Sequence, residues 1–295
     1  MIFSVLESCT NQVTAQSDPK NQPHSAGYLD ETEKNLLNRG LAKYYAHIVA
    51  LFDKEKIFSH VIDFARLSLQ FIAPGSSDIQ TSHLRAEMHS RLFNAAIQTS
   101  RFDLAHSTLN LFTDSALQRT LLRTLVAKMC ENSYASQLVA LPFIGLQDQV
   151  DEILAQKCQS IVDVNAGIPY HKILYAWRIK HNDFRGAASI SLERLQRLQA
   201  SGDGDKLIGD DGFETAVTKQ YVALINALSC VDPKHAWILA EDLPKRSAKG
   251  VVVPSKRKVV QLKDVRKAYQ EELDRIAAIE NGQFAFAGGD EMDIL

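Results

Sequence analysis

Apolar residues recur at helical spacing along most of this chain, and this periodicity constrains the fold more than any other feature. Within residues 30–51, 61–72, 117–129 and 146–161, an apolar side chain returns every three or four positions. Each such stripe covers one face of a helix and has to be buried against a neighbouring helix. The pattern therefore predicts an all-α fold.

Prolines and glycines separate these stretches instead of interrupting them. The 295 residues contain only 8 Pro and 14 Gly, and Pro74, Pro142 and Pro169 all fall between periodic segments. A proline inside a helix removes a backbone hydrogen bond, so prolines at these positions mark helix ends. Asp232 followed by Pro233 predicts the start of a further helix that ends by Pro244.

The segment HNDFRGAASI, residues 181–190, predicts a joint between two packed helices. An aromatic residue at the helix entry anchors it against the preceding helix, and a small residue three positions later lets the backbones approach. This pair occurs at Phe102 with Ala105, Phe184 with Ala187, and Phe213 with Ala216. Gly186 costs its helix about 1 kcal/mol relative to alanine, which close contact with the preceding helix is expected to offset. The unequal intervals favour an irregular α-solenoid of stacked antiparallel helix pairs over a regular tetratricopeptide array.

Charge, cysteine content and the amino terminus constrain the class of protein. The 33 Lys and Arg nearly balance the 35 Asp and Glu, so the field of the whole chain does not select for nucleic acid. The four cysteines lie far apart in sequence, which favours reduced and mostly buried thiols over a disulfide framework or a zinc site. No secretory signal or apolar run of about 18 residues is found, so we expect a soluble intracellular chain.

No catalytic, cofactor-binding or metal-binding site is predicted. Asp203, Asp205 and Glu214 match three positions of a calcium loop, but Leu207 and Ile208 occupy the places of an oxygen ligand and a turning glycine. The glycines of the same segment lack the preceding strand of a dinucleotide-binding loop. This segment is interpreted as a flexible acidic linker, and the chain is predicted not to be an enzyme.

Nine basic residues and a single acid, Asp264, lie between Lys245 and Lys267. Lys256, Arg257 and Lys258 form the centre of this basic patch, which suits nucleic acid or an acidic protein groove. Aromatic residues that could stack on bases are missing from the stretch, which also fits a solvated connector.

Three segments resemble a known family. They are LAKYYAHIVALFDKEKIFSHVIDFARLSL, LVALPFIGLQDQVDEIL and YHKILYAWRIKHNDFRGAASI. In this order they are similar to the carboxy-terminal helical region of the large scaffold nucleoporin of the Y-shaped nuclear-pore subcomplex. That protein is called nucleoporin one-twenty in fungi and nucleoporin one-sixty in vertebrates. The resemblance extends from about Leu41 to about Leu198, and without the family's β-propeller the chain is expected to be the tail alone.

The resemblance implies a structural role in the nucleus, at the nuclear pore complex of the nuclear envelope. The tail of that family joins arms of the Y, and so supports pore assembly and nucleocytoplasmic transport. The partners it implies are the nucleoporins eighty-five and one-forty-five C, the latter called ninety-six in vertebrates. It implies no small-molecule substrate, no cofactor and no insertion into the membrane.

These patterns divide the chain into four segments: a helix fragment with a flexible linker over 1–29, the α-helical solenoid over 30–244, a basic connector with a terminal helix over 245–281, and a loose tail over 282–295. Exposed apolar area for partner contacts is expected on the helices within 213–228 and 262–279. The candidate interface residues are Phe213, Val217, Tyr221, Leu224, Leu262, Val265, Tyr269, Leu273 and Ile276.

Two other classes of function stay open. A nucleic-acid-binding helical module would act through the basic stretch at 245–267, and its binding would weaken steeply with salt. An enzyme of unrecognised type would require a deep pocket lined by convergent polar groups.

Overall fold

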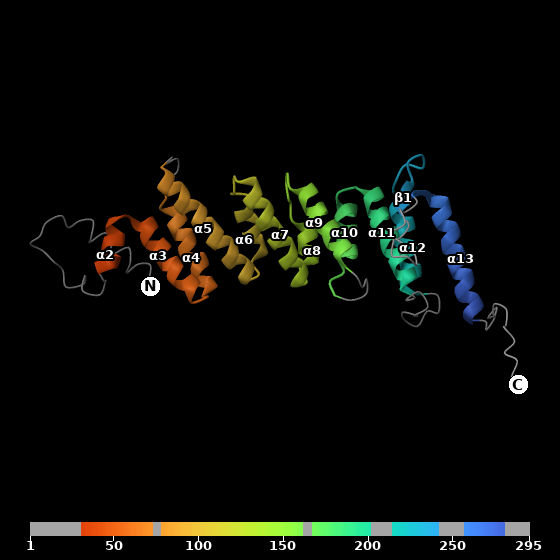
Figure 1. Ribbon diagram of the computed structural model, residues 1–295, viewed down its shortest axis with the longest axis horizontal. Helices are drawn as coiled ribbons and strands as arrows, with labels where there is room; N and C mark the ends of the chain where they lie inside the picture. Colours follow the sequence, from red (N-terminus) through yellow and green to blue (C-terminus); the bar gives the residue numbers. More distant parts are fainter. Residues whose placement is uncertain (1–30, 73–77, 162–166, 202–213, 242–256, 281–295) are drawn as a thin grey trace, which may run out of the picture. The chain divides into compact units, whose positions relative to one another are not determined.

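Helices form nearly all of the regular structure in the residues that the computed structural model describes, 31–72, 78–161, 167–201, 214–241 and 257–280 (Figure 1). The chain divides into two compact units, Met1–Asn132 (unit 1) and Ser133–Leu295 (unit 2). The predicted all-α fold of stacked helix pairs is confirmed. The predicted segments 1–29 and 282–295 lie outside the described residues. No helix in the described ranges is both long and apolar enough to cross a lipid bilayer.

Unit 1 is built from helices that pack in chain order. They are α2 (Glu31–Asn38), α3 (Leu41–Lys54), α4 (Phe58–Gln70), α5 (Ile79–Gln98), α6 (Phe102–Leu109) and α7 (Ser115–Glu131). Tyr45, Val49 and Val61 are buried between α3 and α4, where the Ser68 hydroxyl donates a hydrogen bond of 2.8 Å to the Ala42 carbonyl. Because each helix packs mainly on its sequence neighbours, the unit has the nearest-neighbour architecture of a solenoid.

Unit 2 continues the same plan and ends in a small sheet and a long helix. Its elements are α8 (Ala135–Ala140), α9 (Gln147–Ser160), α10 (Tyr170–Lys180), α11 (Phe184–Ala200), α12 (Ala216–Ser229), β1 (Trp237–Glu241), β2 (Arg257–Gln261) and α13 (Leu262–Glu280). α12 packs on α11 and on α13, and one core cluster unites all three helices with the sheet. The last helix predicted from the sequence is therefore confirmed as α13.

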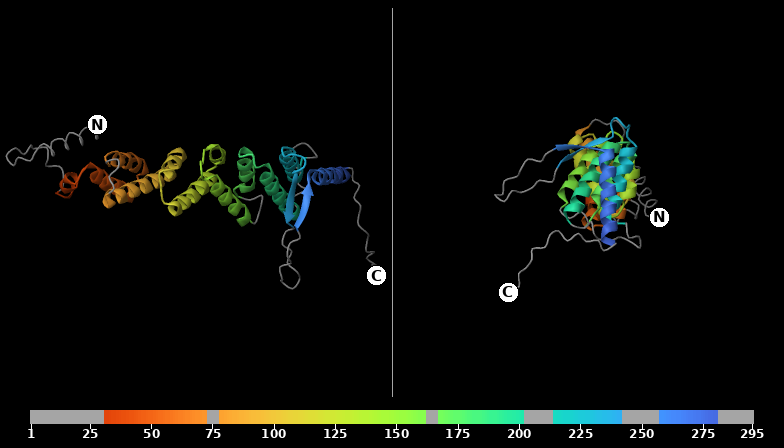
Figure 2. Two further views of the ribbon diagram at one scale, coloured as in Figure 1. Left: turned by 90° about the horizontal axis from the view of Figure 1, so that it is seen from above. Right: turned by 90° about the vertical axis from the view of Figure 1, so that its right-hand side faces the viewer.

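The two strands replace a helix that the sequence predicts. β1 and β2 pair antiparallel, with Leu239 opposite Val259 (Figure 2). The helix expected from Asp232 to Pro244 is wrong, because Asp232 caps only a short turn, where its carboxylate accepts from the Lys234 N–H at 2.9 Å. Beyond the turn, Ile238 and Ala240 are buried while Leu239 between them is exposed, and this period of two belongs to a strand. The pairing joins residues on both sides of the domain boundary expected near residue 244.

Three helix joints share one backbone geometry. In each, a residue with positive φ ends one helix, a second residue follows, and a phenylalanine begins the next helix. The positive-φ residues are Lys56 (58°), Ser100 (55°) and Asn182 (60°). The second residues are Ile57, Arg101 and Asp183, with φ of −89°, −86° and −87° and ψ of 70°, 70° and 69°. The phenylalanines are Phe58, Phe102 and Phe184.

A single hydrogen-bond pattern stabilises these joints. In all three, the N–H of the second residue donates to the carbonyl five positions earlier at 2.9 Å, which satisfies an acceptor that the helix end leaves open. The aromatic and alanine pair predicted at Phe102 with Ala105 lies at such a joint, and both residues are buried. The pair at Phe184 with Ala187 lies at another. Phe213 is outside the described residues, whereas Phe58 begins a joint that the sequence prediction did not include.

The cysteines are buried to different degrees. Cys130 and Cys158 are buried, as expected, whereas Cys230 is exposed, and Cys9 lies outside the described residues. Burial raises the pKa of the Cys158 thiol to about 12, so this thiol stays protonated at neutral pH.

Candidate interaction surfaces

A charged cluster links three consecutive helices of unit 2. Arg178 of α10 donates from Nε and Nη2 to the two carboxylate oxygens of Asp151 on α9, both at 2.8 Å. Its Nη1 donates to the Gly186 carbonyl in the first turn of α11 at 2.9 Å. The hydrogen bonds to Asp151 raise the pKa of Arg178. The planar guanidinium thereby fixes α9, α10 and α11 relative to one another, which a point charge would do less specifically.

Gly186 leaves room for the capping residue of α11, whereas the sequence predicted that it allows close contact with the preceding helix. The Asp183 carboxylate caps the helix by accepting from the Gly186 N–H at 2.9 Å. A Cβ at residue 186 would lie 1.9 Å from Oδ2 of Asp183. The space that the missing side chain leaves is thus filled by the capping carboxylate, and the expected contact with the preceding helix is not what requires glycine.

This geometry predicts an energetic coupling between Asp183 and Gly186. Asp183→Ala should lower the free energy of unfolding by about 1 kcal/mol through loss of the cap. Gly186→Ala should change the free energy of unfolding little. Alanine gains about 1 kcal/mol in helix propensity, but its Cβ displaces the capping carboxylate of Asp183, and the two effects offset each other. In the Asp183→Ala background, the same glycine substitution should stabilise by up to about 1 kcal/mol. Urea unfolding of the unsubstituted chain, the two single variants and the double variant measures this double-mutant cycle. Strictly additive effects would contradict the contact between the Asp183 carboxylate and residue 186.

An aromatic cluster beside the joint holds α10 in place. The Trp177 side chain is 2% exposed and lies edge-on to Phe143, with ring centroids 5.9 Å apart. The centroid of the His181 ring lies 4.1 Å from that of Trp177, and Nδ1 of His181 lies 2.8 Å from the Trp177 carbonyl. Trp177 therefore joins α10 to the segment between α8 and α9.

A second arginine ties α11 to the carboxyl end of α9. Nη1 of Arg197 donates to the carbonyls of Cys158 and Ile161 at 3.1 and 2.9 Å, and so satisfies acceptors that the helix end leaves open. Its Nη2 pairs with Glu193 one turn earlier in α11. The nearby His171 ring, together with the Arg197 guanidinium, lowers the pKa of Glu193 despite its partial burial.

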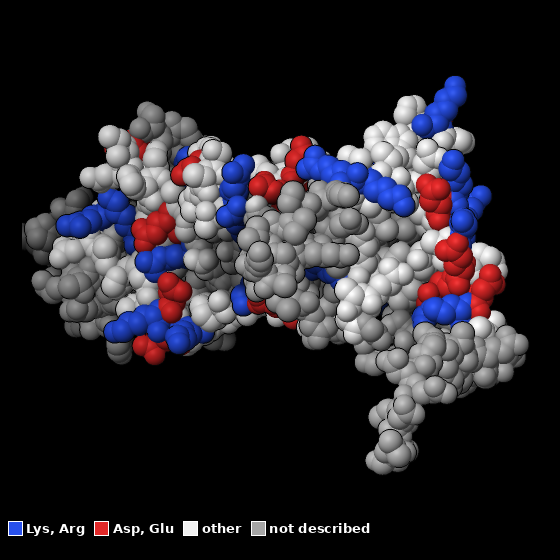
Figure 3. Space-filling model, turned by 45° about the vertical axis from the view of Figure 1, so that its right-hand side comes forward, with Lys and Arg blue, Asp and Glu red and all other residues white. Residues whose placement is uncertain are grey.

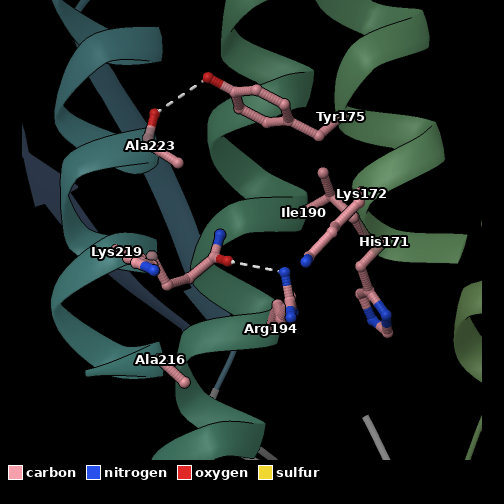
Figure 4. A pocket seen from close by; sticks show the side chains of 9 residues that line it. His171, Lys172, Tyr175, Ile190, Arg194, Ala216, Lys219 and Ala223 are labelled. Carbon is pink, nitrogen blue, oxygen red and sulfur yellow. Dashed lines mark hydrogen bonds between the residues drawn. The ribbon is translucent and has the colours of Figure 1, made fainter. Parts of the chain in front are cut away.

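A groove with an open volume of about 460 Å³ lies between α10, α11 and α12 (Figure 4). Three cations line it, one from each helix: Lys172, Arg194 and Lys219. The remaining lining residues are His171, Tyr175, Ile190, Ala216, Gln220 and Ala223. We call this site the cationic groove, because the described residues that line it include these three cations and no carboxylate. Near its edge, the Tyr175 hydroxyl donates to the Ala223 carbonyl at 3.2 Å and ties α10 to α12.

The residues predicted to contact partners lie mostly inside unit 2. Because α12 packs on both α11 and α13, several of these residues are buried. They are Val217, Tyr221 and Leu224 of α12, and Val265 and Ile276 of α13. Leu262, Tyr269 and Leu273 are half-buried, and Phe213 lies outside the described residues. The exposure expected for the five buried residues is therefore wrong, and their periodic spacing reflects the core of this chain.

Exposed apolar side chains are found instead on the sheet. Leu239 is 51% exposed and its cross-strand partner Val259 is 49% exposed. Trp237 lies on the same face two residues before Leu239, with the Arg185 guanidinium 4.1 Å above its ring. We call Trp237, Leu239 and Val259 the hairpin face. The sequence signal for this face is the alternation of buried and exposed positions in WILAE, residues 237–241. A search for helical spacing alone misses this period of two.

The basic patch is only partly described and is mixed with acids. Arg257 and Lys258 are exposed on β2, while Lys256 lies outside the described residues. Along α13, which follows β2 directly, red acidic side chains lie beside blue basic ones at the right of Figure 3. Within the described ranges, no group of three or more His, Cys, Asp or Glu side chains could hold a metal ion. Of the calcium-like segment, only Glu214 is described.

Comparisons with known proteins identify the family. Residues 4–131 match the family model described as nucleoporin Nup120, HEAT repeats. The chain is 42% identical to nucleoporin NUP120 of Chaetomium thermophilum over an alignment that covers 92% of this chain and 28% of that protein. The chain belongs to the Nup120/Nup160 family of nucleoporins. The resemblance of the three segments to this family is thus confirmed.

Animal members of the Nup120/Nup160 family extend the similarity. The chain is 26% identical to nuclear pore complex protein Nup160 of Mus musculus, over 77% of this chain and 16% of that protein. It is 25% identical to human Nup160, over 76% of this chain and 16% of that protein. The chain thus spans less than a third of the length of these relatives. HEAT repeats are stacked helix pairs, which agrees with the neighbour-on-neighbour packing of unit 1.

Proposed function

We propose that this chain joins arms of the Y-shaped nuclear-pore subcomplex through contacts of its helices and hairpin face with partner nucleoporins. As a Nup120/Nup160-family nucleoporin, it has a scaffold role at the nuclear pore complex, which lies at the nuclear envelope. The proposed partners are the nucleoporins eighty-five and one-forty-five C, or ninety-six in vertebrates. Through these contacts the chain would support pore assembly and nucleocytoplasmic transport.

The observation that carries this proposal is the hairpin face. Most exposed apolar residues in the described ranges, such as Ile144 and Leu111, occur on separate elements, and single ones need no explanation on a soluble surface. Leu239 and Val259 differ, because they are directly paired across the strands and continue into Trp237. Adjacent aliphatic and aromatic side chains with a charged neighbour, here Arg185, are typical of the centre of a protein interface.

Substitutions on the hairpin face should weaken partner binding without unfolding the chain. We expect the double variant Leu239→Lys with Val259→Lys to raise the Kd for at least one partner arm about tenfold or more, because buried lysines at an interface centre lose apolar contact and are desolvated. Co-elution with each purified arm on a sizing column, followed by titration calorimetry, measures the effect. Circular dichroism should show unchanged helix content.

The matched control is the double variant Leu111→Lys with Leu117→Lys, which adds the same charge at exposed apolar residues of unit 1. It should bind as the unsubstituted chain does. Weakening by this control but not by the hairpin variant would move the contact away from the hairpin face. Failure of the unsubstituted chain to bind either arm would reject the arm-joining proposal as a whole.

The alternative, nucleic-acid binding through Arg257, Lys258 and the rest of the 245–267 stretch, has weaker support. Exposed cations on β2 favour it, whereas the acids interspersed along α13 reduce the local field. A mobility shift with short RNA or DNA at low salt, abolished by alanine at Lys256, Arg257 and Lys258, is the result that would favour the alternative.

A further inference from the structure

Within the described part of the chain, the cationic groove contains more positive charge than the neighbouring carboxylates neutralise. Arg194 lies half-buried in the groove, where its Nη1 donates a hydrogen bond of 3.2 Å to the amide oxygen of Gln220 (Figure 4). No carboxylate in the described part of the chain pairs with it. A guanidinium has five N–H donors, so most of its capacity is not used within the groove.

Burial makes this arrangement costly for the protein alone. Removal from water lowers the pKa of Arg194, and no carboxylate among the described residues pairs with Arg194 to offset that effect. Arg185 of α11 is half-buried as well, and its guanidinium lies over the Trp237 ring outside the groove lining. Two other half-buried arginines of α10 and α11, Arg178 and Arg197, each have a carboxylate partner. Of Arg178, Arg194 and Arg197, only Arg194 lacks a described carboxylate partner, so a bound anion would stabilise its buried charge.

Lys172 and Lys219 add further positive charge to the groove that contains Arg194. Lys172 extends from α10 toward the side of the groove where Arg194 lies (Figure 4). Lys219, on α12, forms an ion pair of 2.8 Å with Glu214, but both side chains are about half exposed, and such a surface pair is weak and easily exchanged. His171, which is almost fully buried, lies with Nε2 4.0 Å from Glu193 and has no hydrogen-bond partner at that atom.

We propose that the cationic groove receives acidic side chains from a segment of a partner protein. The volume of about 460 Å³ suits several side chains and exceeds what a single inorganic anion would fill. Ile190, Ala216 and Ala223 give the groove apolar walls beside its cations, which suits the methylene groups of glutamate better than a phosphate ion. The inference deepens the proposed scaffold function, on which it rests, by assigning the chemistry of one contact.

A blocked hexaglutamate peptide carrying a fluorophore is the probe for the groove. We expect saturable binding to the full chain at low ionic strength, measured by fluorescence anisotropy, and no binding of the hexaglutamine counterpart. Arg194→Gln should raise the Kd about tenfold or more, and Arg194→Lys, which keeps the charge, should retain part of the affinity. Lys172→Gln should have a smaller effect in the same direction, because this lysine is exposed.

The control Arg123→Gln removes the same charge from an exposed position on α7 and should leave the Kd unchanged. Equal affinity of the Arg194→Gln and unsubstituted chains, or no binding at all, would overturn the proposal. Displacement of the peptide by inorganic phosphate, at an ionic strength where sodium chloride has no effect, would reassign the groove to phosphate. The assay contains no nucleoporin partner, so its outcome is independent of whether the arms bind.

Discussion

Replacing Trp177 with alanine should lower the free energy of unfolding of unit 2 by about 3–5 kcal/mol, the largest effect we expect for a single residue. The indole is almost completely buried and packs on Phe143, from the segment between α8 and α9, and on His181 at the end of α10 itself. Its removal leaves a cavity that a stack of helices cannot fill without moving α10. Urea unfolding followed by circular dichroism measures the change, and hydrogen exchange assigns it to unit 2.

Ile144→Ala is the matched control for this prediction. Ile144 is a large apolar residue next to Phe143 in sequence, but it is 82% exposed, so its truncation should change stability by less than about 0.5 kcal/mol. A small effect of Trp177→Ala would contradict the central packing role of this residue. So would faster exchange confined to unit 1.

Replacing Arg178 with methionine should destabilise unit 2 by about 2–4 kcal/mol. The change keeps much of the aliphatic bulk but leaves the Asp151 carboxylate and the Gly186 carbonyl without their donor. Because the lost charge leaves a part-buried carboxylate behind, Asp151→Asn in the same chain should recover a share of the loss. The double-mutant cycle should give a coupling of about 1–3 kcal/mol.

An exposed ion pair provides the comparison. Lys128→Met breaks the pair with Glu131 on α7, where both side chains are nearly half exposed, and should cost less than about 1 kcal/mol. Similar losses for the two methionine variants would show that the Arg178 cluster contributes no more than a surface pair. An additive cycle with Asp151 would lead to the same conclusion.

Local signals explain what could be predicted from the sequence. The apolar periodicity locates the helices because each helix in this architecture buries one face against its sequence neighbours, so little information from distant residues is needed. β1 is the exception. Asp232 and Pro233 are good helix-start residues, but the following WILAE buries alternate side chains against α11, and this tertiary contact determines the outcome.

The candidate surfaces were harder to predict than the fold. Tyr221 and Val265 have the same helical spacing whether they face a partner or the core, and only the placement of α13 on α12 decides between these possibilities. Asp151 and Arg178 are 27 positions apart, so their pairing depends on the register of α9 against α10. The cationic groove combines side chains from three helices, and no spacing in the sequence indicates that Lys172, Arg194 and Lys219 lie at one site.

The shared turn at Lys56, Ser100 and Asn182 limits how sequences of this kind can change in length. Only three residues, the helix cap included, separate the consecutive helices there, so one added residue would rotate the start of the second helix by about 100°. Its apolar stripe would then point into water. Insertions and deletions among relatives should accordingly avoid these three turns and collect in the longer connections, where added length leaves the helix faces in register.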